Sequence, residues 1–193
     1  MRAVMSFVLA VLLAVSVGAV RADHPNTVVV ESVRVFTSVT DARFRCTAVM
    51  VEEGIALTAG HCADQIENAA VIIDGAPHLV TKIVKPVAGV DFAILAVPGA
   101  PCPCATDSDA LAAEGELLHT VSFPRGQLLI AGGPFMGRAP VMEDGQIYGL
   151  VFVATAPGSS GGGVFNARGE LIGIITATNG IMTAYIELGA LGL

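Results

Sequence analysis

One serine of this chain stands in a sequence that suits a nucleophile. Ser160 lies in PGSSGGG (157–163), with Gly158 two positions before it and Gly161 and Gly162 directly after it. A serine hydroxyl attacks a carbonyl when a base can take its proton and backbone N–H groups face the oxygen that becomes negative. Glycine tolerates the left-handed conformations of tight turns, so the N–H groups of Gly158 and Ser160 could converge beside the hydroxyl. The alternative is a Gly/Ser loop between two strands, and the motif alone does not decide between the two.

A histidine that could act as the general base lies far upstream of Ser160. His61 stands in TAGHC (58–62), at the end of an apolar stretch. TAGHC resembles the histidine motif of chymotrypsin-fold serine proteases, and PGSSGG resembles their serine motif. In that family the third catalytic residue is an aspartate that opens a short apolar strand, and Asp91 in VDFAILAV (90–97) fits. The order His61, Asp91, Ser160 is also the family's order, unlike that of subtilisins and α/β-hydrolases.

The resemblance implies acyl transfer by an exported serine endopeptidase. His61 would take the proton of Ser160 and pass a proton to the leaving amine, while Asp91 would hold the imidazole in the required tautomer. The N–H groups of Gly158 and Ser160 would form the oxyanion hole. Water would then hydrolyse the acyl-enzyme, with a polypeptide as substrate and no metal or organic cofactor. The alternatives are a catalytically silent relative that binds peptides or a partner protein, and an esterase that uses the same triad.

The four cysteines form two pairs along the chain. Cys46 and Cys62 are sixteen positions apart, and Cys62 directly follows His61. In many animal-type members of the family a disulfide of this spacing brackets the histidine loop, and such a bridge would contribute about 3 kcal/mol. Cys102 and Cys104, in PCPC, could bridge locally, pair with another chain or stay free. We expect them to be oxidised without assigning a partner, since two cysteines are too few for a metal site.

Finer resemblances and departures narrow the branch of the family. The segments 154–177 and 180–188 are similar to the serine region and the last strand of HtrA-type bacterial proteases, which normally add a PDZ domain where this chain stops. Digestive members carry an aspartate before the nucleophile to receive a new amino terminus, whereas Ser159 stands here. We therefore expect an enzyme that is competent without that ion pair. Gly163 replaces the usual proline and predicts a looser loop after the nucleophile.

The expected substrate pocket carries no charged residue. The position six before the nucleophile is aspartate in members that cut after Lys or Arg, and histidine on the facing strand marks the glutamate-specific ones. Five uncharged residues occupy this pocket here: Ala154, Thr155, Ile175, Thr176 and Ala177. A charged side chain would find no partner on burial, so we expect cleavage after small or medium aliphatic residues.

The pattern of the whole chain predicts an all-β fold. β-Branched runs alternate with turn residues every eight to twelve positions and give six candidate strands on each side of a Pro, Gly and Ala-rich linker. The resemblance implies two six-stranded antiparallel Greek-key barrels packed together, with the active site at their joint. The barrels would cover about 27–97 and about 116–190, and the linker about 98–115. The expected strands are 28–37, 43–51, 55–59, 70–73, 79–84 and 92–97 in the first half. In the second half they are 117–123, 127–131, about 138–142, 147–154, 164–165 with 171–176, and 181–188.

The amino terminus predicts export. Arg2 precedes an apolar run from Ala3 to Val20, followed by small residues that a signal peptidase would read, so residues 1–22 form a candidate signal peptide. The protease domain would then be 23–193, secreted or periplasmic, in a compartment that permits disulfides. An uncleaved membrane anchor is the alternative.

Charge and length limit the other functions. The 193-residue chain has a net charge of −7, from 10 Lys and Arg against 17 Asp and Glu. Cleavage after Ala22 would leave 171 residues, remove Arg2 and Arg21, and bring the net charge to −9. Phosphate binding needs a basic patch, so this balance excludes nucleic acid and an anionic membrane surface as partners. The oligomeric state is not indicated.

Overall fold

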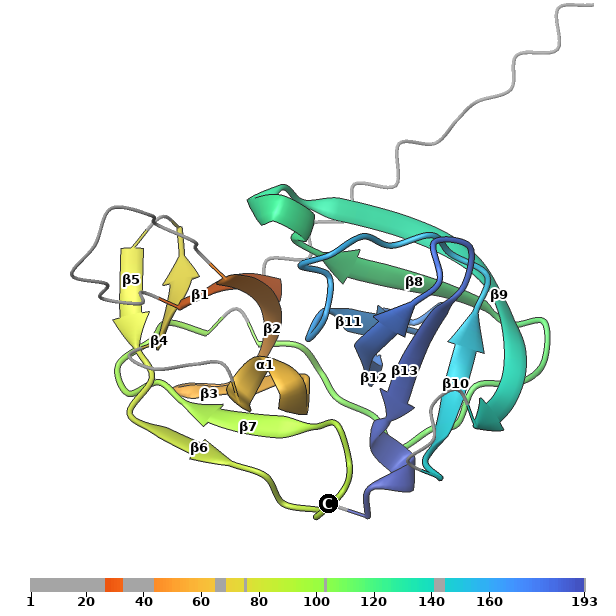
Figure 1. Cartoon of the computed structure of the whole chain (residues 1–193), viewed down its shortest axis with the longest axis horizontal. Coiled ribbons are helices and arrows are strands. Elements are labelled where there is room, and N and C mark those ends of the chain that lie inside the picture. Colours follow the sequence, from red (N-terminus) through yellow and green to blue (C-terminus); the bar gives the residue numbers. More distant parts are fainter. Residues whose placement is uncertain are drawn as a thin grey trace, which may run out of the picture.

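The structure is a computed structural model that consists mainly of β-strands in two halves (Figure 1). It describes residues 27–32, 44–64, 69–74, 76–102, 104–140 and 145–192. The predicted signal peptide, residues 1–22, lies outside the described residues. The all-β fold class that the sequence predicts is confirmed.

Seven antiparallel strands form one sheet in the amino-terminal half, in the order β5-β4-β1-β2-β3-β7-β6. They are β1 (Thr27–Ser32), β2 (Phe44–Glu52), β3 (Ile55–Thr58), β4 (Ala69–Ile73), β5 (Ala76–Leu79), β6 (Lys82–Val84) and β7 (Ala93–Ala96). The sequence predicts one strand over 79–84, and this prediction is wrong. Leu79 pairs with β4, whereas Lys82 pairs with β7 at the opposite end of the sheet. Because only Val80 and Thr81 separate these two strands, the sheet must curl until its ends meet.

Six strands close a barrel in the carboxyl-terminal half, in the order β10-β13-β12-β11-β8-β9. They are β8 (Leu117–Ser122), β9 (Leu129–Pro140), β10 (Ile147–Val151), β11 (Gly163–Phe165), β12 (Leu171–Thr178) and β13 (Thr183–Glu187). The sequence predicts two strands, 127–131 and about 138–142, where β9 is continuous. Gly133 is needed inside the strand, since a Cβ atom there would lie 2.1 Å from the carbonyl oxygen of Phe152.

Helical structure is limited to short turns among the described residues. They are α1 (Gly60–Asp64) and two 3-10 turns, η1 (Pro124–Gly126) and η2 (Leu188–Ala190). No helix in the described ranges is long and apolar enough to cross a membrane.

A shared apolar core joins the two halves. Val49, Leu57 and Phe92 from the first half pack with Val121 and Phe165 from the second, and all five are buried. Each large apolar side chain buried in this way stabilises the fold by about 1.5–3 kcal/mol. The residues that could do chemistry stand next to this core, at the ends of the elements that form it.

Candidate active site

Pairing between β3 and β7 brings His61 next to Asp91. Thr58, the last residue of β3, is opposite Ala93, the first residue of β7. His61 lies three residues after Thr58, and Asp91 lies two residues before Ala93. The Nδ1 atom of His61 lies 2.8 Å from Oδ2 of Asp91, and the backbone N–H of His61 donates to Oδ1 at 2.6 Å. One carboxylate therefore holds both the ring and the backbone of the histidine, which leaves Nε2 on the other side of the ring.

The position of Asp91 is set by its neighbours. Phe92 is 1% exposed and anchors this segment in the core between the two halves. Gly60 lies so close that a Cβ atom there would be 2.8 Å from the backbone N of Phe92 and 3.0 Å from Oδ1 of Asp91. Glycine at position 60 thus lets the histidine loop approach the carboxylate. A hollow of about 260 Å³ lies beside the pair, lined among others by Lys85 and Val90.

A tight turn presents Ser160 between β10 and β11. The N–H of Ser159 donates to the carbonyl of Ala156, and the N–H of Gly162 donates to that of Ser159, each at 2.9 Å. Gly161 N–H donates to the carbonyl of Ile175 on β12 at 2.8 Å. Gly158 has φ = +99°, a conformation that favours glycine. The turn is therefore held by its own backbone and by the neighbouring strand.

Two N–H groups of this turn are free to bind an anion. Within the described ranges, the backbone N–H groups of Gly158 and Ser160 donate to no protein atom. These are the two donors that the sequence predicts for an oxyanion hole. Both residues are half-buried, so a ligand oxygen could reach these N–H groups and accept from them.

The hydroxyl of Ser160 does not contact His61 in this structure. Its Oγ atom donates to the backbone carbonyl of Thr176 at 3.4 Å, and no hydrogen bond joins it to His61 in the described chain. In structures without substrate, hydrogen bonds between a nucleophile and its base are often long and tighten only when substrate binds. Ser160 is half-buried and His61 is 40% exposed, so both can be reached from solvent.

Gly163 does not lie in a loose loop, contrary to the expectation from its missing proline. It is the first residue of β11, is buried, and pairs with both Val121 and Ile174. A Cβ atom at this position would lie 2.4 Å from the ring of Phe165. The neighbouring aromatic side chain thus accounts for a glycine here.

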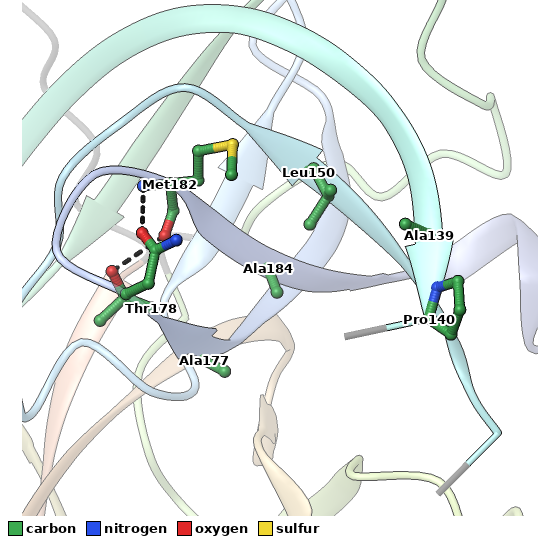
Figure 2. Close-up of a pocket in the computed structure, with 8 residues that line it drawn as sticks. Ala139, Pro140, Leu150, Ala177, Thr178, Met182 and Ala184 are labelled. Atoms are coloured by element: carbon green, nitrogen blue, oxygen red, sulfur yellow. Dashed lines mark hydrogen bonds between the residues drawn. The ribbon is translucent and has the colours of Figure 1, made fainter. Parts of the chain in front are cut away.

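The five predicted pocket residues have different surroundings in the structure. Thr155 is buried and its hydroxyl is within 2.9 Å of that of Thr183, while Ile175 faces the barrel core. Ala154 is exposed, and Thr176 accepts the Ser160 hydroxyl through its carbonyl. Ala177 instead lines an apolar cavity of about 260 Å³ on the outer face of β12, β13 and β10 (Figure 2).

Hydrogen bonds at one end of this apolar cavity fix its rim. Thr178 donates to the carbonyl of Met182, and Met182 N–H donates to the side chain of Asn179 (Figure 2). Leu150 and Ala184 also line the cavity, and neither carries a polar side chain. The cavity therefore offers apolar contact without a charged group.

Both cysteine pairs are disulfides. Cys46 is bonded to Cys62, with 6.2 Å between their Cα atoms, and Cys102 is bonded to Cys104, with 4.8 Å. The second pair therefore takes the local bridge among the three fates that the sequence leaves open. A ring nitrogen of His61 lies within 4.8 Å of both sulfurs of the first pair, but sulfurs bonded to each other offer no thiolate to a metal.

Two buried residues that contact the turn were not found from the sequence. The hydroxyl of Ser122 donates to that of Ser159 at 3.0 Å, and both side chains are buried. The hydroxyl of Thr47 donates to the carbonyl of Gly158 at 2.8 Å. Serine and threonine inside strands are common and form no motif with a turn so distant along the chain, so the sequence carries no signal for either role.

The sequence matches the trypsin-like peptidase domain over residues 46–174. That range includes His61, Asp91 and Ser160. No curated protein matches the chain in sequence.

Several solved protease structures share the fold. The Rv3671c protease of M. tuberculosis in its active form superposes with a TM-score of 0.73 and 18% identity, over 88% of this chain and 78% of that one. The HtrA-type protease AlgW, solved with a decapeptide, gives 0.75 and 19%, over 86% and 62%. A serine endoprotease of Yersinia pestis gives 0.70 and 19%, over 88% and 60%. The chain thus spans less than two thirds of these last two proteins.

Proposed function

Because the chain belongs to the trypsin-like peptidase family, we propose that it is a serine endopeptidase that uses His61, Asp91 and Ser160. The observation that carries the proposal is the double hydrogen bond from His61 to the Asp91 carboxylate, which fixes the imidazole with Nε2 directed away from Asp91. A silent relative would have no need for this arrangement beside an accessible serine.

In the proposed reaction, Ser160 Oγ attacks a peptide carbonyl while His61 Nε2 accepts its proton. The C–N bond then breaks, and the same proton passes to the leaving amine. Asp91 stabilises the imidazolium while it is charged, and it keeps the Nδ1–H tautomer before attack. The free N–H groups of Gly158 and Ser160 bind the oxyanion, and each such donor typically lowers the barrier by about 3 kcal/mol. Water then hydrolyses the acyl-enzyme ester by the same steps in reverse, with water in the place of the amine.

The nucleophile must leave its ground-state contact to react. Ser160 Oγ donates to Thr176 O at 3.4 Å, which is a weak hydrogen bond by distance. In the proposed reaction the hydroxyl turns toward His61, and side-chain rotations take ps to ns. The contact with Thr176 therefore sets no appreciable barrier to catalysis.

Competence without a newly cut amino terminus is part of the proposal. The hydroxyl of Ser159 accepts from Ser122, and the N–H of Ala156 lies 3.4 Å from it. These neutral contacts occupy the place where digestive enzymes bury a carboxylate that needs a partner. We expect full-length and shortened forms to cleave at equal rates, and activity in the shortened form alone would contradict this.

The preferred substrate is a polypeptide with a small or medium aliphatic residue before the cleaved bond. Ala154 and Thr155 carry no charge, and the hydroxyl of Thr155 is already occupied by Thr183. The related protease AlgW was solved with a decapeptide, which is consistent with a peptide substrate. A peptide library with strict cleavage after Lys, Arg or Glu would contradict this preference.

Export through residues 1–22 fits the two disulfides, because such bonds persist in oxidising compartments. We propose a secreted or periplasmic enzyme that begins at Asp23. Amino-terminal sequencing of the protein recovered from an exporting host checks the cleavage site. A protein that keeps Met1 and sediments with membranes would instead be anchored.

The decisive experiment is active-site labelling of the purified protein. A fluorophosphonate probe should modify the wild type and leave Ser160→Ala unlabelled, because only an activated serine reacts. His61→Ala should also lose labelling, whereas Ser108→Ala, which changes another partly buried serine, should not. An absence of Ser160-dependent labelling and of peptide cleavage would overturn the proposal in favour of a peptide-binding protein.

A further inference from the structure

Thr47 connects the two halves of the molecule at the turn that carries Ser160. It lies in β2, and its side chain is fully buried. Thr47 pairs with Val29 of β1 on one side, but the pairing of β2 with β3 begins only at Val49, so the other edge of β2 has no strand beside Thr47. The backbone there faces the Ser160 turn instead, and it donates its N–H to the carbonyl of Ser160 at 2.8 Å.

The hydroxyl of Thr47 joins three segments of chain. It donates to the carbonyl of Gly158 at 2.8 Å and accepts from the N–H of Phe123, just after β8, at 2.9 Å. A hydroxyl has one hydrogen to donate and lone pairs to accept, so both contacts can form together. Thr58 holds the backbone of Thr47 in place, because its hydroxyl donates to the Thr47 carbonyl at 2.8 Å.

The two carbonyls that Thr47 binds belong to the residues with the free N–H groups. The N–H groups of Gly158 and Ser160 have no acceptor in the described chain, and the carbonyls of both residues accept from Thr47. Glycine at position 158 rotates with little steric restraint, so its N–H keeps a fixed direction only if the rest of the residue is held. The sulfur of Cys62, in the disulfide with Cys46, also lies 3.8 Å from the carbonyl of Ser160.

We propose that Thr47 is a positioning residue that holds the oxyanion-binding N–H groups of Gly158 and Ser160 in register with His61. This inference rests on the proposed function. Thr47 touches neither substrate nor the reacting atoms, and it acts through the two carbonyls. Because it extends from the half that carries His61 and Asp91, it sets the distance between the base and the nucleophile turn.

Isosteric replacement separates this role from a general role in stability. Thr47→Val keeps the shape but removes the hydroxyl, and Thr47→Ser keeps the hydroxyl. Removal of one oxyanion donor lowers kcat about 10²–10³-fold, so loss of a group that positions such donors should lower kcat by about tenfold or more, with little change in KM. Thr47→Ser should stay within about threefold of the wild type, since its hydroxyl can make the same two contacts.

Thr120→Val is the matched control. Thr120 is also a fully buried strand threonine whose hydroxyl donates to one carbonyl, that of Ala131, away from the turn. The Thr120→Val variant should lose about as much unfolding free energy as Thr47→Val, while its kcat remains that of the wild type. Rates are compared with peptide substrate and with fluorophosphonate, at a temperature where thermal melts show each variant folded.

The outcomes separate the two proposals. An inert wild type overturns the proposed function and this inference with it. An active wild type overturns the inference alone if Thr47→Val loses no more kcat than Thr120→Val, or if Thr47→Ser is as impaired as Thr47→Val. If Thr47→Val does not fold, Thr47→Ala carries the same expectation. Failure of both to fold, beside an active Thr47→Ser, would assign the hydroxyl to folding and would also overturn the inference.

Discussion

Gly161 packs directly against the amino-terminal half of the molecule. A Cβ atom there would lie 1.9 Å from the carbonyl oxygen of Thr47 and 2.2 Å from the hydroxyl oxygen of Thr58. Its φ of +84° also belongs to the region that L side chains rarely adopt. The absence of a side chain therefore lets the Ser160 turn pack closely against β2, where Thr47 can reach the carbonyls of the turn.

Gly161→Ala should abolish most of the activity, because the turn must move away from β2 to make room. We expect kcat to fall by about 100-fold or more, comparable to the loss of an oxyanion donor. Gly169→Ala is the control, since Gly169 has a similar φ of +76° but no atom within 4 Å of a built Cβ. It should cost about 1 kcal/mol of unfolding free energy through backbone strain and leave kcat unchanged. Equal effects on kcat would show that the close approach is unimportant.

Tyr185 carries a hydroxyl that is buried without a hydrogen-bond partner, alone among the described side chains. Burial raises the pKa of Tyr185 well above its ordinary value. Because the unfolded chain then loses its proton more readily, stability should fall as the pH rises above about 10. Tyr185→Phe should remove this part of the fall and, at pH 7, raise the unfolding free energy by about 1 kcal/mol. Urea unfolding at pH 7 and above pH 10 measures both effects. A lower free energy of unfolding for Tyr185→Phe at pH 7 would contradict the prediction, because it would mean that the hydroxyl has a hydrogen-bond partner.

At the residue scale, the sequence predicted those groups that belong to short motifs. His61 and Ser160 stand in such motifs, and Asp91 follows from the resemblance that they establish. Thr47 and Ser122 could not be predicted, because their roles depend on hydrogen bonds to a turn that lies 111 and 37 residues away. Only the packing of the two halves creates these contacts.

At the scale of elements, Arg138 on β9 and Glu187 on β13 tie the carboxyl-terminal barrel together. The guanidinium donates to both oxygens of Glu187 at 2.6 and 2.7 Å, and to the carbonyl of Ala112 at 3.1 Å. It also lies 5.0 Å from the centre of the Phe135 ring. The Glu187 side chain is only 6% exposed. The hydrogen bond to Glu187 raises the pKa of Arg138, so the guanidinium stays charged at ordinary pH.

Arg138→Met should destabilise the barrel by about 3 kcal/mol, because it leaves a buried carboxylate without a partner. Urea unfolding at pH 7 measures the difference. Adding Glu187→Leu should recover most of the loss, because it removes the unpaired carboxylate. Failure to recover it would mean that Arg138 acts through packing alone.

The sequence predicted the positions of most strands but not which strands pair with each other. Alternation of β-branched and turn residues marks a strand, whereas pairing depends on which strands meet in space. The prediction over 79–84 was wrong for this reason, since both observed strands there look alike in sequence. The break predicted within β9 was wrong because Gly133 serves a close approach to Phe152, which only the barrel reveals.

At the scale of the whole molecule, the two disulfides have unequal positions. Cys46 precedes Thr47 and Cys62 follows His61, so their bond links the residue that contacts the Ser160 turn to the loop that carries His61. Cys102 and Cys104 join only neighbouring residues in the segment between β7 and β8. The first bond therefore connects parts of the site, whereas the second leaves the site untouched.

Removal of each disulfide should have a different effect on stability and activity. In the chain-entropy description, the longer loop closed by Cys46 and Cys62 contributes about 3 kcal/mol, and the three-residue loop closed by Cys102 and Cys104 about 1.6 kcal/mol. The double variant Cys46→Ala with Cys62→Ala should show the larger loss of unfolding free energy and a lower kcat. Cys102→Ala with Cys104→Ala should show the smaller loss and a normal kcat. Denaturant unfolding and peptide cleavage below both melting temperatures distinguish them, and an equal fall in kcat would show that the first disulfide does not position the site.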